Sequence, residues 1–338
     1  MSQKSREAGE NKMGKYLYGI INSGNKRSFG NIGVGNGEIY SVQFEGVGAV
    51  VSDVFENCKI GMKEIKIHDE VLRKIMQPHA VIPMSFGIVA KDEEEIRDIL
   101  KRARMKLKIT LEKVDHKVQI NVKISWDKAI LASILKENIE IQKLTRETKV
   151  NADKLLRVEL GRKVKSALDK KKNEYMTEIN SLLKSLSCES EENKVADQDT
   201  LMNAAFLVDK KREQGFYSKL DELEKKYEGK LKFLAIGPLP PYNFTKLGIK
   251  RIDFNVVEEA RKTLELSHEV SISEINSAYN RLVRQYHPDL HPDDPAAEEK
   301  FKKIKNAYDL LTKYCEHYLC SLRKTKVEET ILVEEKDS

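Results

Sequence analysis

Cysteine is scarce in this chain of 338 residues, and the few cysteines are widely spaced. The four of them are Cys58, Cys188, Cys315 and Cys320. None forms the CxxC spacing of a metal knuckle, and Cys315 and Cys320 on one helix would miss the i,i+4 register that brings two side chains together. We therefore expect reduced structural thiols and no metal site built from cysteine.

Long apolar runs are also lacking. No stretch approaches the ~18 residues that a membrane span requires, and residues 1–15 are polar, without the apolar centre of a secretion signal. Aromatic residues make up only 7% of the chain, whereas charged residues make up 34%, above the ~25% of a typical globular protein. These features predict a cytoplasmic, largely helical and well-solvated protein that does not contact a membrane.

The sequence contains no recognisable catalytic motif. GxSxG, GxxxxGK[ST] and HExxH are all missing, and no cysteine stands beside a histidine base, although a triad assembled from distant segments would escape this search. The glycine-rich run at residues 30–37 precedes a predicted strand rather than the helix N-terminus that a phosphate site needs. His68 and His79 have no carboxylate or cysteine at ligand spacing, and we assign them no role. We expect a protein without cofactor that is not an enzyme.

A formal net charge of +6 gives little support for nucleic-acid binding. Residues 128–190 hold 14 basic and 9 acidic side chains, so the excess is spread over long mixed-charge helices. Such helices usually present a solvated face rather than a phosphate-binding patch. We expect no nucleic-acid partner.

The sequence pattern predicts two α/β domains with a helical region after them. Residues 1–12 are expected to be a disordered tail, and residues 13–113 are expected to form an α+β domain with strands at 15–21, 39–44 and 47–52 and helices at 66–76 and 92–107. Residues 114–247 open with the alternating strand 117–126 and continue with long helices to 186, a loop at 187–200, strand 204–208, helix 214–227 and strand 231–236. This β-α-β-α-β order predicts a ferredoxin-like variant with its helices on one face.

Two amphipathic helices dominate residues 251–320. The first carries its apolar stripe on Ile275, Ala278, Tyr279, Leu282 and Tyr286 behind a capping serine at 271 or 273, and the second repeats the pattern from Phe301 to Leu311. The connecting loop is rich in proline and aspartate, so the stripes can be buried only against each other in an antiparallel hairpin. A shorter helix at 256–266 would support the pair. Residues 321–338 are expected to be a disordered tail.

This hairpin resembles the J-domain family. The signature of that family is a His-Pro-Asp tripeptide directly after its second helix, which corresponds here to the helix that ends at Tyr286. Here the tripeptide is His287-Pro288-Asp289; a second copy at residues 291–293 does not directly follow Tyr286. A loop metal site built from His287, His291, Asp289 and Asp293 is the alternative interpretation. The resemblance implies an all-α J-domain in which Pro288 stiffens the loop and Asp289 presents a carboxylate to a DnaK-type ATPase chaperone.

The resemblance also implies a basic face on the helix before the tripeptide, which meets an acidic surface of the chaperone. Arg281 and Arg284 match that face, and Tyr279 completes the expected chaperone-binding set. Asn276, Ser277, Asn280 and Gln285 stand where the family often carries Lys or Arg. This difference implies weaker or more specialised docking.

Residues 13–247 resemble the gas vesicle protein F/L family. The segments that carry the match are Lys15-Tyr-Leu-Tyr-Gly-Ile20, Val47–Asp53, His68-Asp-Glu-Val-Leu72, Val81-Ile-Pro-Met-Ser-Phe-Gly87, Lys123-Ile-Ser-Trp-Asp127, Asn203-Ala-Ala-Phe-Leu-Val208 and Gly237-Pro-Leu-Pro-Pro-Tyr-Asn-Phe244. Membership implies binding to the small, hydrophobic gas vesicle shell protein and to other accessory proteins. The combined hypothesis is an assembly factor that recruits a DnaK-type chaperone, and the alternative is a general J-domain co-chaperone whose first 250 residues bind unrelated clients.

Overall fold

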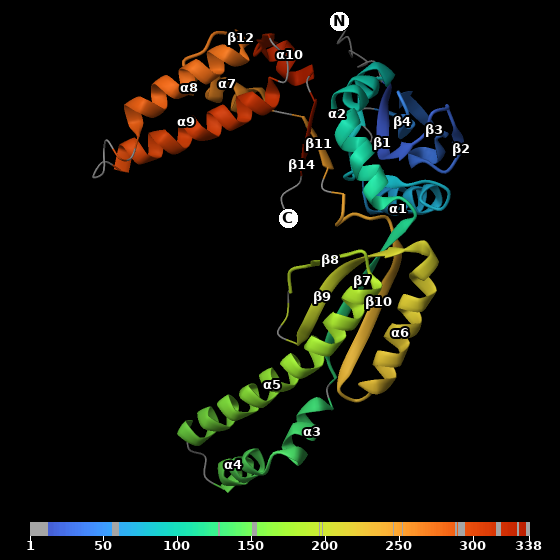
Figure 1. Ribbon diagram of the computed structural model, residues 1–338, viewed down its shortest axis with the longest axis vertical. Helices are drawn as coiled ribbons and strands as arrows, with labels where there is room; N and C mark the ends of the chain where they lie inside the picture. Colours follow the sequence, from blue (N-terminus) through green and yellow to red (C-terminus); the bar gives the residue numbers. More distant parts are fainter. Residues whose placement is uncertain are drawn as a thin grey trace, which may run out of the picture. The chain divides into compact units, whose positions relative to one another are not determined.

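The computed structural model describes residues 13–55, 61–127, 129–150, 154–195, 197, 199–245, 247–251, 253–287, 289, 295–315, 319–329 and 331–335 (Figure 1). The chain divides into two compact units. One unit consists of Met1–Glu93 and Arg104–Lys246, and the other consists of Glu94–Ala103 and Leu247–Ser338.

The N-terminal part of the first unit contains an antiparallel sheet with strand order β2-β3-β4-β1-β5, in which β6 also pairs with β1. Its strands are β1 (Met13–Asn22), β2 (Ser28–Gly30), β3 (Ile39–Phe44), β4 (Val47–Phe55), β5 (Val81–Pro83) and β6 (Val89–Ala90). Its helix is α1 (Met62–Ile75), and α2 (Glu93–Val114) is divided between the two units, because Glu94–Ala103 belong to the second. Tyr16 and Tyr18 of β1 are fully buried in one cluster with Val71, Leu72 and Ile75 of α1. The core therefore lies between strand β1 and helix α1.

Two positions in this part of the chain require glycine, one for close packing and one for its backbone angles. A Cβ on Gly19 of β1 would lie 2.9 Å from the Ile82 carbonyl oxygen and 2.9 Å from Leu72 Cδ2, so only glycine permits this approach of strand and helix. The glycine-rich run forms a short 3-10 turn, η1 (Val34–Asn36), in which Gly35 has a φ of 68°. Strand β3 follows directly, so this run is a loop connection between strands, as its sequence context indicated.

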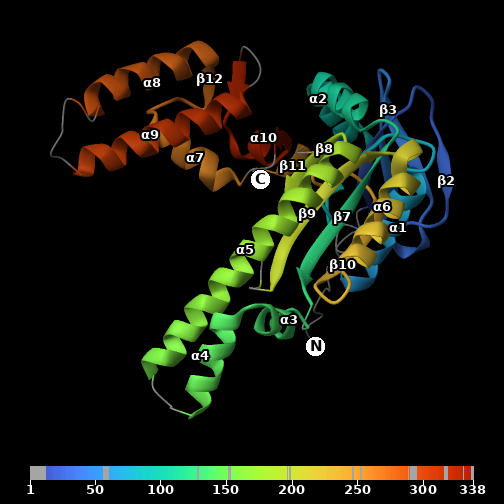
Figure 2. The ribbon, with the colours of Figure 1, turned by 60° about the horizontal axis from the view of Figure 1, so that its bottom comes forward.

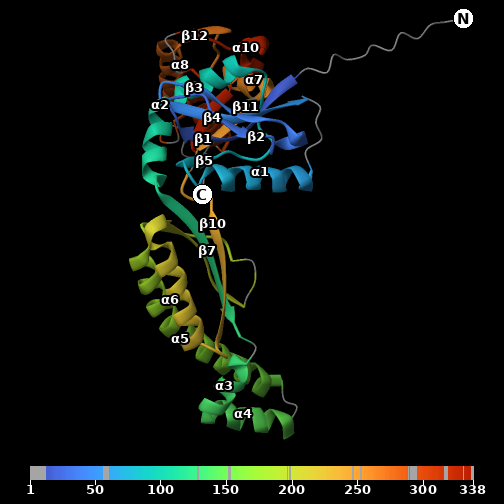
Figure 3. The same cartoon turned by 90° about the vertical axis from the view of Figure 1, so that its right-hand side faces the viewer.

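The second half of the first unit has the ferredoxin-like order β-α-β-β-α-β. Strands β7 (Lys117–Trp126), β8 (Glu189–Glu192), β9 (Thr200–Asp209) and β10 (Leu231–Leu239) form an antiparallel sheet ordered β10-β7-β9-β8. Helices α5 (Lys154–Leu186) and α6 (Glu213–Lys226) cover one face of this sheet (Figure 3). The turn η2 (Lys210–Arg212) leads into α6.

Strand β8 corrects the expectation of a loop over residues 187–200. Its four residues, Glu189-Ser-Glu-Glu192, carry no apolar side chain, so neither β propensity nor alternation marks them as a strand. The backbone pairs with β9 all the same, from Glu189 opposite Leu207 to Glu192 opposite Ala204. An edge strand needs burial on neither face, and charge on such a strand hinders further pairing.

Helix α5 continues beyond the sheet and packs against α3 (Ile130–Glu137) and α4 (Ile139–Val150) (Figure 2). A small core forms there around Ile130 and Ile141, with Leu160, Val164 and Leu168 of α5 packed on it. Leu155 and Val158, nearer the start of α5, are 76% and 46% exposed. The apolar side chains of this part of α5 are therefore buried only where α3 and α4 lie against them.

In the second unit, helices α7 (Phe254–Thr263), α8 (Ile272–Tyr286) and α9 (Pro295–Tyr314) enclose a core of their own, which includes Val257, Ile275 and Leu311. Helices α8 and α9 form the expected hairpin (Figure 1). The region is not all-α, because β12 (Glu269–Ser271) pairs with β13 (Leu319–Ser321), and β11 (Leu247–Arg251) pairs with β14 (Ile331–Glu335). The segment expected to be a disordered tail instead holds α10 (Lys324–Glu329) and β14, and Val327 is fully buried.

The expectation of free thiols at the end of this unit is wrong for one pair. Helix α9 ends at Tyr314, so Cys315 follows the helix and Cys320 lies in β13. Their Cα atoms lie 5.4 Å apart, within the range that a disulfide bond requires, and the two sulfurs are bonded. The i,i+4 argument failed because it placed both cysteines on one helix. Cys188 is free and exposed.

Candidate functional site

Helix α8 is fixed at its N-terminus by a capping box. Ser271 Oγ accepts a hydrogen bond from the backbone N–H of Glu274 over 3.2 Å, and Glu274 Oε2 accepts from the Ser271 backbone N–H over 2.7 Å. The hydrogen bond from the Ser271 backbone lowers the pKa of the Glu274 carboxyl. The sequence pattern allowed Ser271 or Ser273 as the cap, and the structure selects Ser271.

The hairpin is held together by a stacked pair of tyrosines. The ring centroids of Tyr279 on α8 and Tyr308 on α9 lie 4.1 Å apart at 23°, and the Tyr308 hydroxyl donates to Asn276 Oδ1 over 2.9 Å. Tyr279 is therefore half-buried against α9, and its observed contacts are those of packing between the two helices. Asn276, which stands where the related family often carries a basic residue, is engaged in the same contact.

The His-Pro-Asp turn begins where α8 ends. His287 is the C-cap of α8 and has extended backbone angles (φ −63°, ψ 133°), as expected of a residue before proline. Its ring packs edge-on against Phe301 of α9, with centroids 5.7 Å apart. Pro288 and the second copy at residues 291–293 lie outside the described residues, and so does His291 of the alternative metal site.

Asp289 is the exposed group of this turn. Its backbone N–H donates to His287 Nδ1 over 3.2 Å, while its side chain is 87% exposed, with Oδ2 at 3.5 Å from His287 Nδ1. The imidazole thus packs against α9, while the Asp289 carboxylate lies in solvent. An exposed carboxylate can form a charge-assisted hydrogen bond with a cation of another molecule.

The two predicted arginines differ in their surroundings. Arg281 Nη2 lies 2.6 Å from Glu265 Oε2, and both side chains are more than half exposed, so solvent screens this ion pair strongly. Arg284 is exposed and has no ion-pair partner within the described part of the chain. Lys300, which the sequence pattern did not single out, lies over the Tyr286 ring with its Nζ 4.8 Å from the centroid. The one sequence signal for this contact is that Lys300 directly precedes Phe301, which packs on His287, the residue after Tyr286.

His68 and His79 of the first unit are structural residues. His68 is 4% exposed, its Nδ1 is 3.0 Å from the Tyr16 hydroxyl, and its ring stacks on Tyr18 at 5.5 Å. Burial lowers the pKa of His68 and also that of His79, whose ring packs edge-on against Phe29. These contacts account for both residues as parts of aromatic packing, and neither needs a further role.

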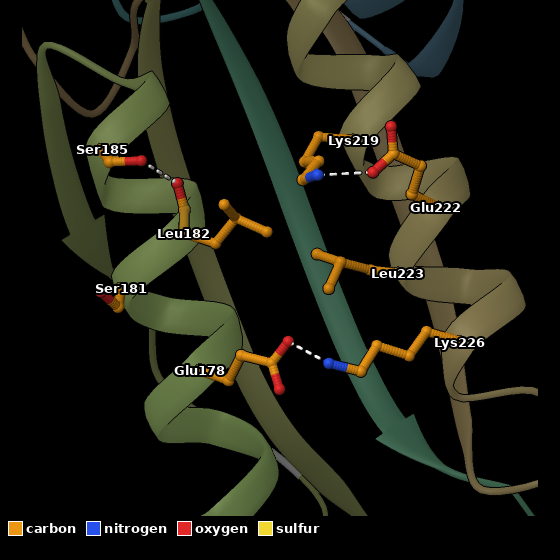
Figure 4. Close-up of a pocket in the computed structure, with 8 residues that line it drawn as sticks. All are labelled: Glu178, Ser181, Leu182, Ser185, Lys219, Glu222, Leu223 and Lys226. Carbon is orange, nitrogen blue, oxygen red and sulfur yellow. Dashed lines mark hydrogen bonds and ion pairs between the residues drawn. The ribbon is translucent and has the colours of Figure 1, made fainter.

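A groove between α5 and α6 is a polar hollow of the helical face (Figure 4). Leu182 and Leu223 form its floor, and ion pairs from Lys226 to Glu178 and from Lys219 to Glu222 lie at its rim. The lysines are therefore engaged, and the groove holds no nucleophile next to a base. Within the described residues there is also no cluster of three His, Cys, Asp or Glu suited to a metal, and no helix both long and apolar enough to cross a membrane.

Comparisons with known proteins agree with this division of the chain. The family model described as gas vesicle synthesis protein GvpL/GvpF matches residues 14–246, and the DnaJ domain model matches residues 261–316. Gas vesicle protein F of Streptomyces sp. (strain CB03234) is 26% identical over 242 residues, which cover 69% of this chain and 100% of that protein. The chaperone protein DnaJ of Halothermothrix orenii is 53% identical over 49 residues, 14% of this chain and 13% of that protein.

Solved structures show the same fold for the first unit. The crystal structure of gas vesicle protein GvpF from Anabaena sp. PCC7120 superposes with a TM-score of 0.60 at 22% identity, covering 69% of this chain and 98% of that one. The GvpF structure from Microcystis aeruginosa gives a TM-score of 0.56 at 20% identity with the same coverage. The fold predicted from the sequence, a mixed α/β region followed by a helical J-domain region, is confirmed. The chain belongs to the GvpL/GvpF family of gas vesicle synthesis proteins and carries a DnaJ domain after the family region.

Proposed function

We propose that this chain is a non-enzymatic gas vesicle assembly factor that binds the hydrophobic shell protein through its GvpL/GvpF region and recruits a DnaK-type chaperone through its J-domain. The observation that carries the proposal is the presence of both family regions in one chain, with the Asp289 carboxylate exposed to solvent. The proposed place of action is the cytoplasm, next to forming gas vesicles. ATP hydrolysis would belong to the chaperone.

A physical reason favours such a fusion. A subunit with a large exposed apolar surface aggregates before it assembles, and a chaperone can protect it only if the two meet in time. A short tether between two binding modules raises the effective concentration of one near the other to about the millimolar range. Joining a shell-binding region to a J-domain would therefore direct the chaperone to this client in preference to others.

The proposal is tested by two measurements on the full-length protein. The first is the steady-state ATPase rate of a DnaK-type chaperone with the wild type, with Asp289→Asn and with Asp309→Asn. Asp309 is an exposed carboxylate on α9, so its substitution is the matched control. We expect stimulation by the wild type and the control, and its loss in Asp289→Asn, because the exposed carboxylate would no longer pair with a cation.

The second measurement is light scattering of shell protein diluted from denaturant with the chaperone and ATP. Wild type should lower the scattering, and Asp289→Asn should not. ATPase stimulation without any binding to the shell protein would leave the alternative, a general J-domain co-chaperone with an unrelated client. Binding to the shell protein without Asp289-dependent stimulation would contradict the role assigned to the J-domain.

A further inference from the structure

The two edges of the second sheet are protected very differently. Strand β8 forms one edge with four residues, of which Glu189, Glu191 and Glu192 are carboxylates. Short length and charge are the usual means by which a protein prevents its sheet edge from pairing with another chain. This edge is therefore closed to further strands.

Strand β10 forms the other edge and is less protected: it carries one charge, Lys232, and its proline, Pro238, lies only near its end, beside a register shift between Ile236 and Leu239. It runs for nine residues, Leu231–Leu239, and within the described residues only β7 pairs with it. Leu234 and Ile236 are 54% and 49% exposed, and the period of two along a strand places both on the same face. Leu231 and Phe233 point to the opposite face, toward the core under α6, so Leu234 and Ile236 lie on the face without helices (Figure 3).

A hollow of about 650 Å³ adjoins the same strand on the helix-covered side. It lies between the first residues of β10 and the C-terminal half of α6, with Phe233 in its wall. Four carboxylates line it, against two amines; the carboxylates are those of Asp127, Asp221, Glu224 and Glu228, and the amines are those of Lys225 and Lys232. The hollow therefore favours a cationic side chain.

We propose that the β10 edge binds an extended protein segment as an additional strand, and that this segment alternates apolar residues with Lys or Arg. The main-chain N–H and C=O groups on the outer side of β10 would pair with it, as in strand addition. Its apolar residues would cover Leu234 and Ile236 on the open face, while its basic residues would reach the carboxylates beside α6. This binding mode is independent of chaperone recruitment, and it goes beyond the proposed function by naming the surface and the chemistry of a partner.

The residues of β10 argue against a second copy of this chain as the occupant. In an antiparallel pair centred on Ala235, the partner strand would turn Phe233, Ala235 and Gly237 toward the helix-covered side. None of these carries a positive charge, so the carboxylates of the hollow would gain no partner beyond the contact of Asp127 with Lys232 at 3.8 Å. A nucleic acid would bring its own negative charge to the same acidic wall.

The test uses the full-length protein and fluorescein-labelled ten-residue peptides. One peptide alternates Val and Lys, a second has the same composition in two blocks, and a third alternates Val and Glu. Fluorescence anisotropy should show at least about tenfold tighter binding of the Val/Lys alternating peptide than of the other two. Equal binding of the alternating and block peptides, or no binding of any of them, would overturn the proposal.

Variants locate the binding to the edge. Leu234→Lys together with Ile236→Lys should weaken binding about tenfold or more, because both side chains are exposed and charge on an edge strand opposes pairing. Met105→Lys with Ile109→Lys is the matched control, since these side chains on α2 are 64% and 62% exposed. Glu224→Lys with Glu228→Lys should shift the preference from the Val/Lys to the Val/Glu peptide. Wild-type self-association that the Leu234/Ile236 variant abolishes would instead identify a second copy as the occupant and refute the proposed partner.

Discussion

The backbone N–H of Asp289 donates a hydrogen bond to Nδ1 of His287 over 3.2 Å, so the acceptor nitrogen of the imidazole is fixed by the residue that presents the exposed carboxylate. The same ring packs edge-on against Phe301 of α9. His287 therefore links the backbone of Asp289 to α9, and Asp289 offers its charge to solvent. This arrangement separates a positioning residue from the residue that would contact the chaperone.

The first prediction follows from that separation. His287→Ala should reduce ATPase stimulation by about tenfold or more, because the turn loses its anchor on α9. The unfolding free energy should change by less than about 1 kcal/mol, since the ring is at the rim of the hairpin. Urea unfolding and the chaperone ATPase assay measure the two effects. Normal stimulation by a correctly folded variant would show that the anchor is dispensable.

Arg284 and Arg281 should contribute unequally to chaperone binding. Glu265 already neutralises part of the Arg281 charge, whereas Arg284 has no such partner among the described residues. Arg284→Ala should therefore raise the dissociation constant for the chaperone more than Arg281→Ala does, and the difference should shrink as salt is added. Titrations at two ionic strengths test this order. A larger effect of Arg281→Ala would show that its pair with Glu265 opens on binding.

The capping box predicts a local stability effect. Ser271→Ala should lower the unfolding free energy of the J-domain by about 1 kcal/mol, because it leaves the Glu274 backbone N–H without its acceptor. Ser273→Ala is the control, since this exposed serine lies inside the first turn and its carbonyl accepts from Ser277 in either case. Urea unfolding, monitored with a spectroscopic probe on α8, distinguishes the two variants. Equal loss in both variants would speak against the cap.

Much of the fold was predictable because its apolar patterns are local. Strands β3 and β7 have the predicted bounds, and the apolar stripes of α8 and α9 are sufficient on their own to indicate the hairpin. Strand β8 was not predictable, because an all-polar edge strand is specified by its partner β9 and not by its own residues. The disulfide was missed for a similar reason, since the end of α9 at Tyr314 decides whether Cys315 and Cys320 can meet.

At the candidate site, the motif identified the residue types but could not give their contacts. The stacking of Tyr279 on Tyr308, the pairing of Arg281 with Glu265 and the Lys300–Tyr286 contact all join residues of different segments. Such pairs depend on the crossing of the helices, and this crossing has no signature in a single sequence. The motif thus indicates the position of the site, and packing decides which of its charges are engaged.

Burial of His68 predicts a pH dependence of stability. Its pKa is lowered in the folded state, so the unfolded chain takes up the proton first as the pH falls through the ordinary value of ~6.5. The stability contribution of the neutral ring is complete above that pH and is lost below it, with a slope of up to about 1.4 kcal/mol per pH unit until the lower folded pKa is reached. His68→Gln, which cannot titrate there, should flatten this part of the profile.

Urea midpoints between pH 5 and pH 8 measure this dependence. His116→Asn is the control, because His116 is 81% exposed at the side chain and its φ of 54° suits asparagine. The control should keep the wild-type slope. If His68→Gln keeps it as well, another group governs the acid sensitivity of the protein.

The Cys315–Cys320 bond predicts a specific redox behaviour of the J-domain. Both cysteines lie in one tryptic peptide, Tyr314–Arg323, so in air-exposed protein this peptide should be two hydrogen atoms lighter than its dithiol form and resist alkylation until it is reduced. The exposed Cys188 should be alkylated with or without reductant and serves as the internal control.

The same bond should affect thermal stability. Closing so short a loop contributes about 2 kcal/mol in the chain-entropy description, so a reductant should lower the melting temperature of the wild type. Cys315→Ser with Cys320→Ser should melt at one temperature with and without reductant. In the cytoplasm, where we propose that the protein acts, thiols are kept mostly reduced, so the oxidised fraction should be smaller in cells than in purified protein. Full alkylation of both cysteines in unreduced protein would contradict the bond.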